Sequence, residues 1–269
     1  MIQMIAKMFS YPFIIHAFIV GVFVSLCAAL LGVSLVLKRF SMIGDGLSHV
    51  SFGALSIAVA CGWAPLPVSI PIVVAAAFFL LRITDNGKMK SDAAIAVLSS
   101  SSLAIGITVT ALTTGMNTDV SSYMFGSILA MSNADVIISV ILSIVVLLLY
   151  FFCYNKLFAV TFDENFAQAS GVSVNFYRMV IAVFTAVTIV LGMRMMGAML
   201  ISSLIIFPAL TAMRMAKSFR GVVICAAVLS VINFCIGLIV SFLYATPTGA
   251  SIVIVNLLVL IIVTAIQKI

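Results

Sequence analysis

The sequence predicts an all-α, polytopic membrane protein with about eight or nine spanning helices. Of its 269 residues, 65% are hydrophobic and 7% are charged, whereas a soluble domain carries roughly a quarter charged residues. Several stretches of about 18 residues or more contain almost no charge, and such a stretch can cross a hydrocarbon core as a helix. The apolar runs are continuous and do not alternate with a period of two, which excludes a closed β-barrel.

Each expected span is an apolar run, and in chain order the runs cover residues 13–37, 41–60, 66–81, 92–114, 134–154, 179–193, 197–215, 220–244 and 249–267. Pro65, Pro67 and Pro71 crowd the junction of the second and third runs, so a count of eight stays open. The run at 121–131 is too short to span, and we expect a short helix that lies at the interface or dips inward. Because the spans fill the chain, residues 1–269 are expected to form a single transmembrane domain.

The distribution of Lys and Arg predicts the orientation. With the N-terminus outside and nine spans, only Lys7 and Arg194 lie on the outer side. The remaining eleven cations fall on the inner side: Lys38, Arg39, Arg82, Lys88, Lys90, Lys156, Arg178, Arg214, Lys217, Arg220 and Lys268. Cytoplasmic loops carry such an excess of cations, so we expect an N-out, C-in topology. The net charge of +6 therefore belongs to membrane loops and does not indicate a nucleic-acid partner.

The inner loop at 157–178 contains the stretch "TFDENFAQASGV" (161–172), which has the pattern of a short helix. Thr161 and Glu164 form a capping-box pattern, and Gly171 suits a left-handed helix end. We expect a helix of two to three turns at about 162–171.

The polar face of this short helix distinguishes two roles. A helix that rests on lipid headgroups usually presents Lys and Arg, but this one presents Asp163, Glu164, Asn165 and Gln168, with Phe162 and Phe166 on one side. The composition favours a helix that docks a cytoplasmic protein, and the interfacial helix is the alternative.

Asp45 and His49, within "SMIGDGLSHV" (41–50), are the ionisable pair that we single out. At positions i and i+4 of a helix they share a face, and a carboxylate with an imidazole suits a divalent first-row metal. The small residues Gly44 and Ser48 allow a neighbouring helix to approach closely. The alternative is that Ser41 or Asp45 caps the span and His49 is hydrogen-bonded in a polar junction. The charge count places the pair at the inner end of the second span.

A second block, "GAMLISSLIIFPALTAMRMA" (197–216), combines small residues with a proline. Gly197, Ser202 and Ser203 permit close packing, and Pro208 should kink the span. The block can either line a pathway or pack at a crowded interface, and the sequence alone leaves both open.

The remaining polar groups receive simpler interpretations. Asn233 and Asn256 are expected to hydrogen-bond between helices. Arg194 is expected to snorkel from an outer span end, and Asp135 to be a solvated cap. The Gly87-Lys88 pair lacks the rest of a phosphate-binding loop, so we expect no enzymatic activity here, with any ATP hydrolysis on a separate chain.

Five ordered blocks together resemble one family. They are "LGVSLVLKRFSMIGDGLSHVSFGAL" (31–55), "SSYMFGSILAMSNAD" (121–135), "FDENFAQASGV" (162–172), "GAMLISSLIIFPALTAMRMA" (197–216) and "TPTGASIVI" (246–254). This series is similar to the membrane permease of bacterial ABC importers for zinc, manganese and iron, the ZnuB/MntB-like family. The likeness covers nearly the whole chain.

The resemblance implies a type II ABC importer-like bundle in the bacterial inner membrane, present as a homodimer. Cytoplasmic ATPase subunits would dock on the loop helix, and an extracytoplasmic metal-binding protein would deliver the ion. Asp45 and His49 match the positions that this family links to metal in the translocation path. The coupling residues that it implies here are Asp163, Glu164, Phe166, Ala167 and Gly171. No permanently bound cofactor is expected, because the divalent metal is the cargo.

The sequence indicates the identity of the metal less directly than it indicates the family. One imidazole suits zinc and one carboxylate also suits manganese, while the blocks at 122–131 and 245–253 look more like the zinc branch. We therefore favour zinc, then manganese, then iron. A secondary transporter driven by an ion gradient is the rival class, but it predicts internal inverted repeats, which the sequence does not display. A structural subunit without a transport path would need no paired ligands.

Overall fold

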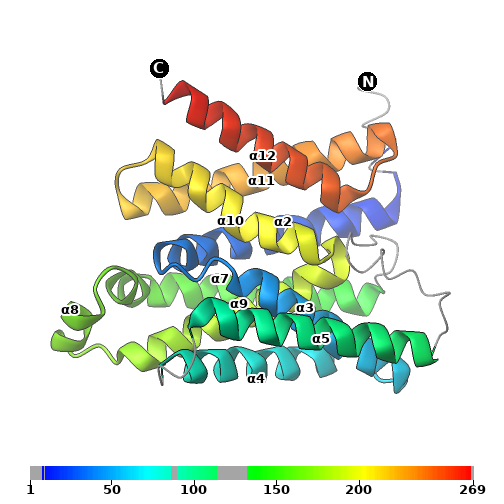
Figure 1. Ribbon diagram of the computed structural model, residues 1–269. Helices are drawn as coiled ribbons and strands as arrows, with labels where there is room; N and C mark the ends of the chain where they lie inside the picture. Colours follow the sequence, from blue (N-terminus) through cyan, green and yellow to red (C-terminus); the bar gives the residue numbers. More distant parts are fainter. Residues whose placement is uncertain (1–7, 9, 86–89, 114–131, 268–269) are drawn as a thin grey trace.

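The computed structural model describes residue 8 and residues 10–85, 90–113 and 132–267, and every regular element in these residues is an α-helix (Figure 1). Nine of the described helices are long and apolar enough to cross a membrane. In chain order the helices are α2 (Pro12–Leu37), α3 (Ile43–Ala60), α4 (Pro65–Asp85), α5 (Ser91–Thr113), α7 (Asn133–Phe162), the short α8 (Glu164–Ala169), α9 (Val174–Met196), α10 (Ala198–Met215), α11 (Phe219–Tyr244) and α12 (Thr248–Ile266). The stretch at 121–131 lies outside the described residues.

The predicted spans are confirmed, and nine spans replace the open choice between eight and nine. The main differences lie at the helix ends. Helix α7 continues to Phe162, past the expected end at 154, and α9 begins at Val174 instead of 179. Hydropathy locates the apolar part of a helix, whereas packing decides how far the helix continues into water. Leu157 and Val160 remain fully buried in the last turns of α7, which holds these turns helical.

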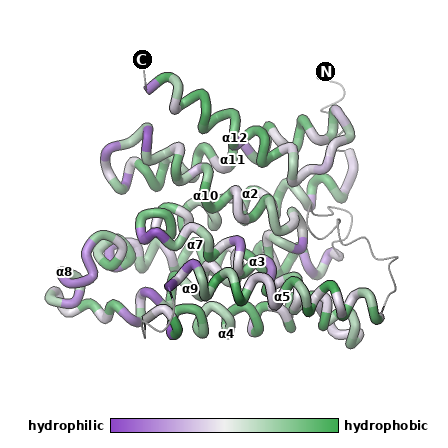
Figure 2. The backbone as a smooth tube through the Cα atoms, in the orientation of Figure 1, coloured by the Kyte–Doolittle hydropathy of each residue, from purple (hydrophilic) through white to green (hydrophobic). Residues whose placement is uncertain are grey.

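The spans run roughly parallel to one another and alternate in direction (Figure 1). The α2–α3 and α10–α11 connections lie at the same end of the bundle as α8, on the left of Figure 1, and we call this the α8 end. The α3–α4, α9–α10 and α11–α12 connections lie at the opposite end. Figure 2 shows apolar residues along the middle of the spans and hydrophilic ones at α8 and at helix ends.

Helices α2 and α3 form the centre of the bundle. Helix α2 packs against α7, α9, α10 and α11, while α3 packs against α4, α5, α9 and α10. Glycines let backbones touch: a Cβ added at Gly32 would lie 2.0 Å from the carbonyl oxygen of Ile205 in α10. The outer helices bury much less of their length, and they expose large apolar side chains such as Leu112 and Phe152, as a lipid-facing surface requires.

Several buried polar contacts join the spans, and two of them bear on residues that the sequence singled out. Asn233 Nδ2 of α11 donates a hydrogen bond of 2.9 Å to Asn256 Oδ1 of α12, which confirms the expected interhelical bond. At the end opposite α8, Arg194 Nη2 lies 3.0 Å from Asp135 Oδ2. Asp135 forms a capping box with Ser132 at the start of α7, which confirms the predicted cap. It is only 8% exposed, so it is also a buried ion-pair partner and is not solvated as the sequence predicted. Arg194 is held by this carboxylate, and the snorkelling interpretation was wrong.

Candidate metal-contact pair and coupling helix

Asp45 and His49 lie in the first two turns of α3, directly after the short connection from α2. His49 Nε2 is 3.7 Å from Asp45 Oδ2, so the two side chains share a face as the spacing predicts. The Asp45 side chain is 44% exposed and that of His49 is 16% exposed. Two atoms that ligate one ion at about 2.0–2.2 Å each lie roughly 3–4 Å apart, so this separation suits two ligands of a single metal.

Close packing fixes the start of α3 between two helices. A Cβ added at Gly44 would lie 3.1 Å from Ile205 Cδ1 of α10, and one added at Gly46 would lie 2.6 Å from Ile95 Cγ2 of α5. Ser48 is fully buried, and its Oγ donates a 2.7 Å hydrogen bond to the Asp45 carbonyl oxygen. The pair is therefore held on a rigid helix end, and the Ser48 hydroxyl proton is already used inside that helix.

The small-residue block at 197–216 packs against this helix end. Gly197 adopts φ 82° and separates α9 from α10, a backbone conformation that favours glycine. Ser202 contributes backbone to the space beside Gly44, and its Oγ donates to the Ala198 carbonyl oxygen. Ser203 is buried, and its hydroxyl has no hydrogen-bond partner among the described residues. Pro208 lies buried inside α10. The structure thus brings the Gly44 and Ser202 regions together.

The short helix α8 differs from its sequence prediction in its cap and length. Asp163 is the N-cap, and its Oδ1 accepts a 3.0 Å hydrogen bond from the Phe166 amide. Thr161 lies inside α7, where its Oγ1 donates to the Leu157 carbonyl oxygen, so the Thr161–Glu164 capping box was wrong. Helix α8 covers only Glu164–Ala169. Gly171 follows with φ 79°, the left-handed end that the sequence predicts.

Ion pairs hold α8 against the ends of two spans. Glu164 Oε1 is 2.6 Å from Lys38 Nζ at the end of α2 and 3.9 Å from Arg178 Nε of α9. Ala167 is completely buried, whereas Phe162 and Phe166 are 60% and 65% exposed. Asp163 therefore caps α8 and Glu164 anchors it, and both stay exposed beside Phe166 and the amide side chains of Asn165 and Gln168.

Among the described residues, no third His, Cys, Asp or Glu joins Asp45 and His49 in a group able to hold a metal. A structural zinc site needs four protein ligands. One chain therefore offers an incomplete set of metal ligands. Such a set suits a transported ion better than a permanently bound one.

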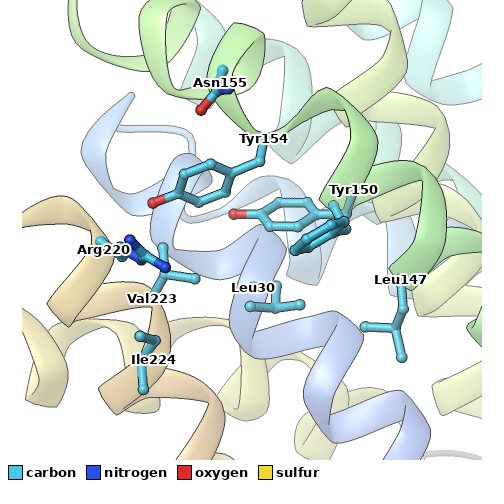
Figure 3. Close-up of a pocket in the computed structure, with 9 residues that line it drawn as sticks. Leu30, Leu147, Tyr150, Tyr154, Asn155, Arg220, Val223 and Ile224 are labelled. Atoms are coloured by element: carbon cyan, nitrogen blue, oxygen red, sulfur yellow. The ribbon is translucent and has the colours of Figure 1, made fainter.

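A cavity of about 580 Å³ between α2, α7 and α11 was missed by the sequence reasoning (Figure 3). Its lining includes Leu30, Tyr150, Tyr154 and Arg220. These residues come from three helices that are distant in the chain, so no local sequence signal marks the cavity.

Comparison with known families identifies the class of protein. Residues 10–267 match the family described as the ABC 3 transport family. The chain belongs to this family, and it is a multi-pass membrane permease. The resemblance inferred from the five sequence blocks is thereby confirmed.

The relatives are named for the transport of different metals. The chain is 29% identical to the high-affinity zinc uptake system membrane protein ZnuB of Haemophilus influenzae, over 91% of this chain and 94% of ZnuB. It is also 29% identical to the manganese import system permease protein ScaB of Streptococcus gordonii, over 97% of this chain and 93% of ScaB. The solved structure of PsaBC from Streptococcus pneumoniae in complex with Fab matches with a TM-score of 0.87 at 29% identity, covering 98% of this chain and 95% of that chain.

Proposed function

We propose that this protein is the permease subunit of an ATP-driven importer of a divalent transition metal in the bacterial inner membrane. The observation that carries the proposal is the Asp45–His49 pair, whose ligand atoms lie 3.7 Å apart on a rigid, partly exposed helix end. The zinc and manganese importers among its relatives support the same cargo class. In this role the two side chains contact the metal in transit, and a partly hydrated ion completes its coordination with water.

A second copy of the chain is the proposed partner within the membrane. Helix α5 is largely exposed, and small residues recur along its outer face at Ala93, Ala96, Ser100 and Ala104. Small residues at this spacing let two helices approach closely in a bilayer. The first turns of α5 also flank the pair, since Gly46 meets Ile95. A homodimer packed through α5 would place two Asp45–His49 pairs near one pathway.

ATP hydrolysis is assigned to a separate cytoplasmic chain that docks on α8. Phe166 supplies an exposed apolar contact, while Ala167 packs α8 onto the bundle and Gly171 ends it. Asp163 and Glu164 keep the helix in place through the cap and the Lys38 ion pair. An extracytoplasmic metal-binding protein delivers the ion at the opposite end. Since the pair lies at the α8 end, it acts as a late contact on the inward path.

The N-out orientation can be tested with a natural thiol. Cys61 is exposed at the end of α3 opposite α8. An impermeant maleimide added to intact cells should label the wild type, and Cys61→Ser should lose that signal. Labelling that appears only after the membrane is opened would reverse the orientation.

Zinc is the favoured cargo, because imidazole is a common zinc ligand, and manganese is the second choice. The test is uptake of radioactive zinc and manganese by vesicles that contain the permease with its ATPase. Asp45→Ala and His49→Ala should reduce uptake more than about tenfold, since even residues that only support a ligand contribute 10–100-fold.

Lys217→Gln is the control, because Lys217 is an exposed charged residue in the connection between α10 and α11 and has no assigned role. Wild-type uptake by both Asp45 and His49 variants, at unchanged assembly, would remove the pair from the pathway. Uptake that continues without ATP but stops when the ion gradient is collapsed would favour the secondary transporter.

A further inference from the structure

Helices α7 and α11 both pack on α2, and the cavity of about 580 Å³ lies between them with Leu30 of α2 in its lining (Figure 3). Its rim includes Phe151 and Ile224, which are 77% and 57% exposed. Such apolar side chains on the outer surface of a spanning helix face lipid. The cavity is therefore open toward the bilayer.

The lining combines apolar and polar residues. Leu30, Leu147, Val223 and Ile224 offer only hydrocarbon, whereas Tyr154, Asn155 and Arg220 bring polar groups. Arg220 is the second residue of α11, and the Tyr154–Asn155 pair lies near the end of α7. Both of these helix termini lie at the α8 end of the bundle (Figure 1). The polar groups thus lie at headgroup depth, and the apolar lining continues toward the membrane interior.

Arg220 is the cation of the cavity. It is exposed, and Tyr154 of α7 lines the same space. No described carboxylate lies within ion-pair distance of Arg220. Figure 3 shows the hydroxyls of Tyr150 and Tyr154 directed toward the side of the cavity where Arg220 lies. A guanidinium without a carboxylate partner, beside a phenol hydroxyl, offers hydrogen-bond donors that suit a phosphate.

We propose that this cavity is a binding site for an anionic phospholipid from the leaflet at the α8 end. The phosphate accepts hydrogen bonds from Arg220 and the Tyr154 hydroxyl, and an acyl chain fills the groove between α7 and α11. Basic pockets between spanning helices bind anionic headgroups in this way. The bound lipid seals α7 against α11 at the end where α8 is attached, which makes the membrane composition a condition for a stable coupling surface.

The test measures lipid retained by the purified full-length permease. Native mass spectrometry after exchange into phosphatidylglycerol or phosphatidylcholine should show preferential retention of phosphatidylglycerol by the wild type. Arg220→Gln should retain about fivefold less, the usual effect of one cation near anionic lipid. Lys217→Gln is the matched control, since Lys217 is exposed in the same connection but does not line the cavity.

A second pair of variants tests the groove itself. Ile224→Trp should fill the cavity and reduce retention of phosphatidylglycerol severalfold, whereas Val228→Trp, one turn further along the exposed face of α11, should not. Equal retention by the wild type, Arg220→Gln and Ile224→Trp would overturn the proposal. Cross-linking of the cavity rim to a second copy of the chain, with no lipid retained, would overturn it as well and assign the groove to a protein partner.

Discussion

The two Asp-containing pairs at opposite ends of the bundle are built differently. Asp135 accepts both Arg194 contacts and the hydroxyl and amide of Ser132, and its side chain is 12% exposed. Among the described residues, Asp45 has His49 as its ion-pair neighbour at 3.7 Å, and its side chain is 44% exposed. Within the described chain its carboxylate accepts no hydrogen bond, since Ser48 bonds to the backbone carbonyl instead.

This difference separates a structural pair from a binding pair. A carboxylate whose oxygens all accept hydrogen bonds has no free acceptor for a ligand. Asp135 is of this kind, and it joins α7 to α9. A carboxylate with free oxygens beside an imidazole can take a cation without first breaking a strong bond. The number of unused acceptors therefore distinguishes the two pairs better than the residue types do.

The largest expected effect belongs to the closed pair. Removal of one partner of a buried ion pair costs about 3–5 kcal/mol, because the other charge stays buried alone. Arg194→Met should lower the free energy of unfolding by roughly 3 kcal/mol, measured by thermal unfolding in detergent. The double variant Arg194→Met with Asp135→Asn should recover part of this loss. A single variant as stable as the wild type would show that this pair is not structural.

A smaller effect is expected at the open pair, and it depends on metal. Without metal, Asp45→Asn should change stability by less than about 0.5 kcal/mol, as for an ordinary exposed substitution. Zinc at about ten times its dissociation constant should stabilise the wild type by roughly 1.4 kcal/mol and Asp45→Asn hardly at all. Thermal unfolding with and without zinc measures both values. Equal stabilisation of the two proteins would place the zinc elsewhere.

The spans could be predicted because a bilayer leaves few options for an apolar chain. Continuous uncharged runs fixed the helices, and the i, i+4 spacing of Asp45 and His49 sufficed to place both on one face. The resemblance supplied the family. Helix ends were less predictable, because buried Leu157 and Val160 extend α7 through Thr161, where a local capping pattern seemed to start a new helix.

Long-range contacts could not be predicted from the sequence. Asp135 and Arg194 meet across 59 residues, so each received a local explanation that the structure replaced. Glu164 also has a partner that no local pattern indicates, since its carboxylate contacts Lys38 across 126 residues, and its role in docking stays a prediction. A single sequence shows which residues can interact, but only the packing of the spans selects the partners.

The Lys38–Glu164 pair at α8 is intermediate between these two pairs in exposure, and we expect it to contribute little to stability. Its contact is short at 2.6 Å, but the Glu164 side chain is 46% exposed, and exposed pairs contribute about 1 kcal/mol or less. Glu164→Gln should therefore lower the free energy of unfolding by less than about 1 kcal/mol, measured as for the other variants.

Glu164→Gln should have a clearer effect on the coupling between ATP hydrolysis and metal transport, because the ion pair holds α8 to the end of α2. In vesicles with the ATPase, Glu164→Gln should lower metal uptake per ATP hydrolysed while binding of the ATPase persists through exposed Phe166. A double variant adds Gln168→Glu to Glu164→Gln. This second change restores the net charge of α8 but places the carboxylate away from Lys38. If the double variant restores coupling, the net charge of α8 is what matters. If it does not, the position of the carboxylate against α2 is decisive, and α8 transmits movement through that contact.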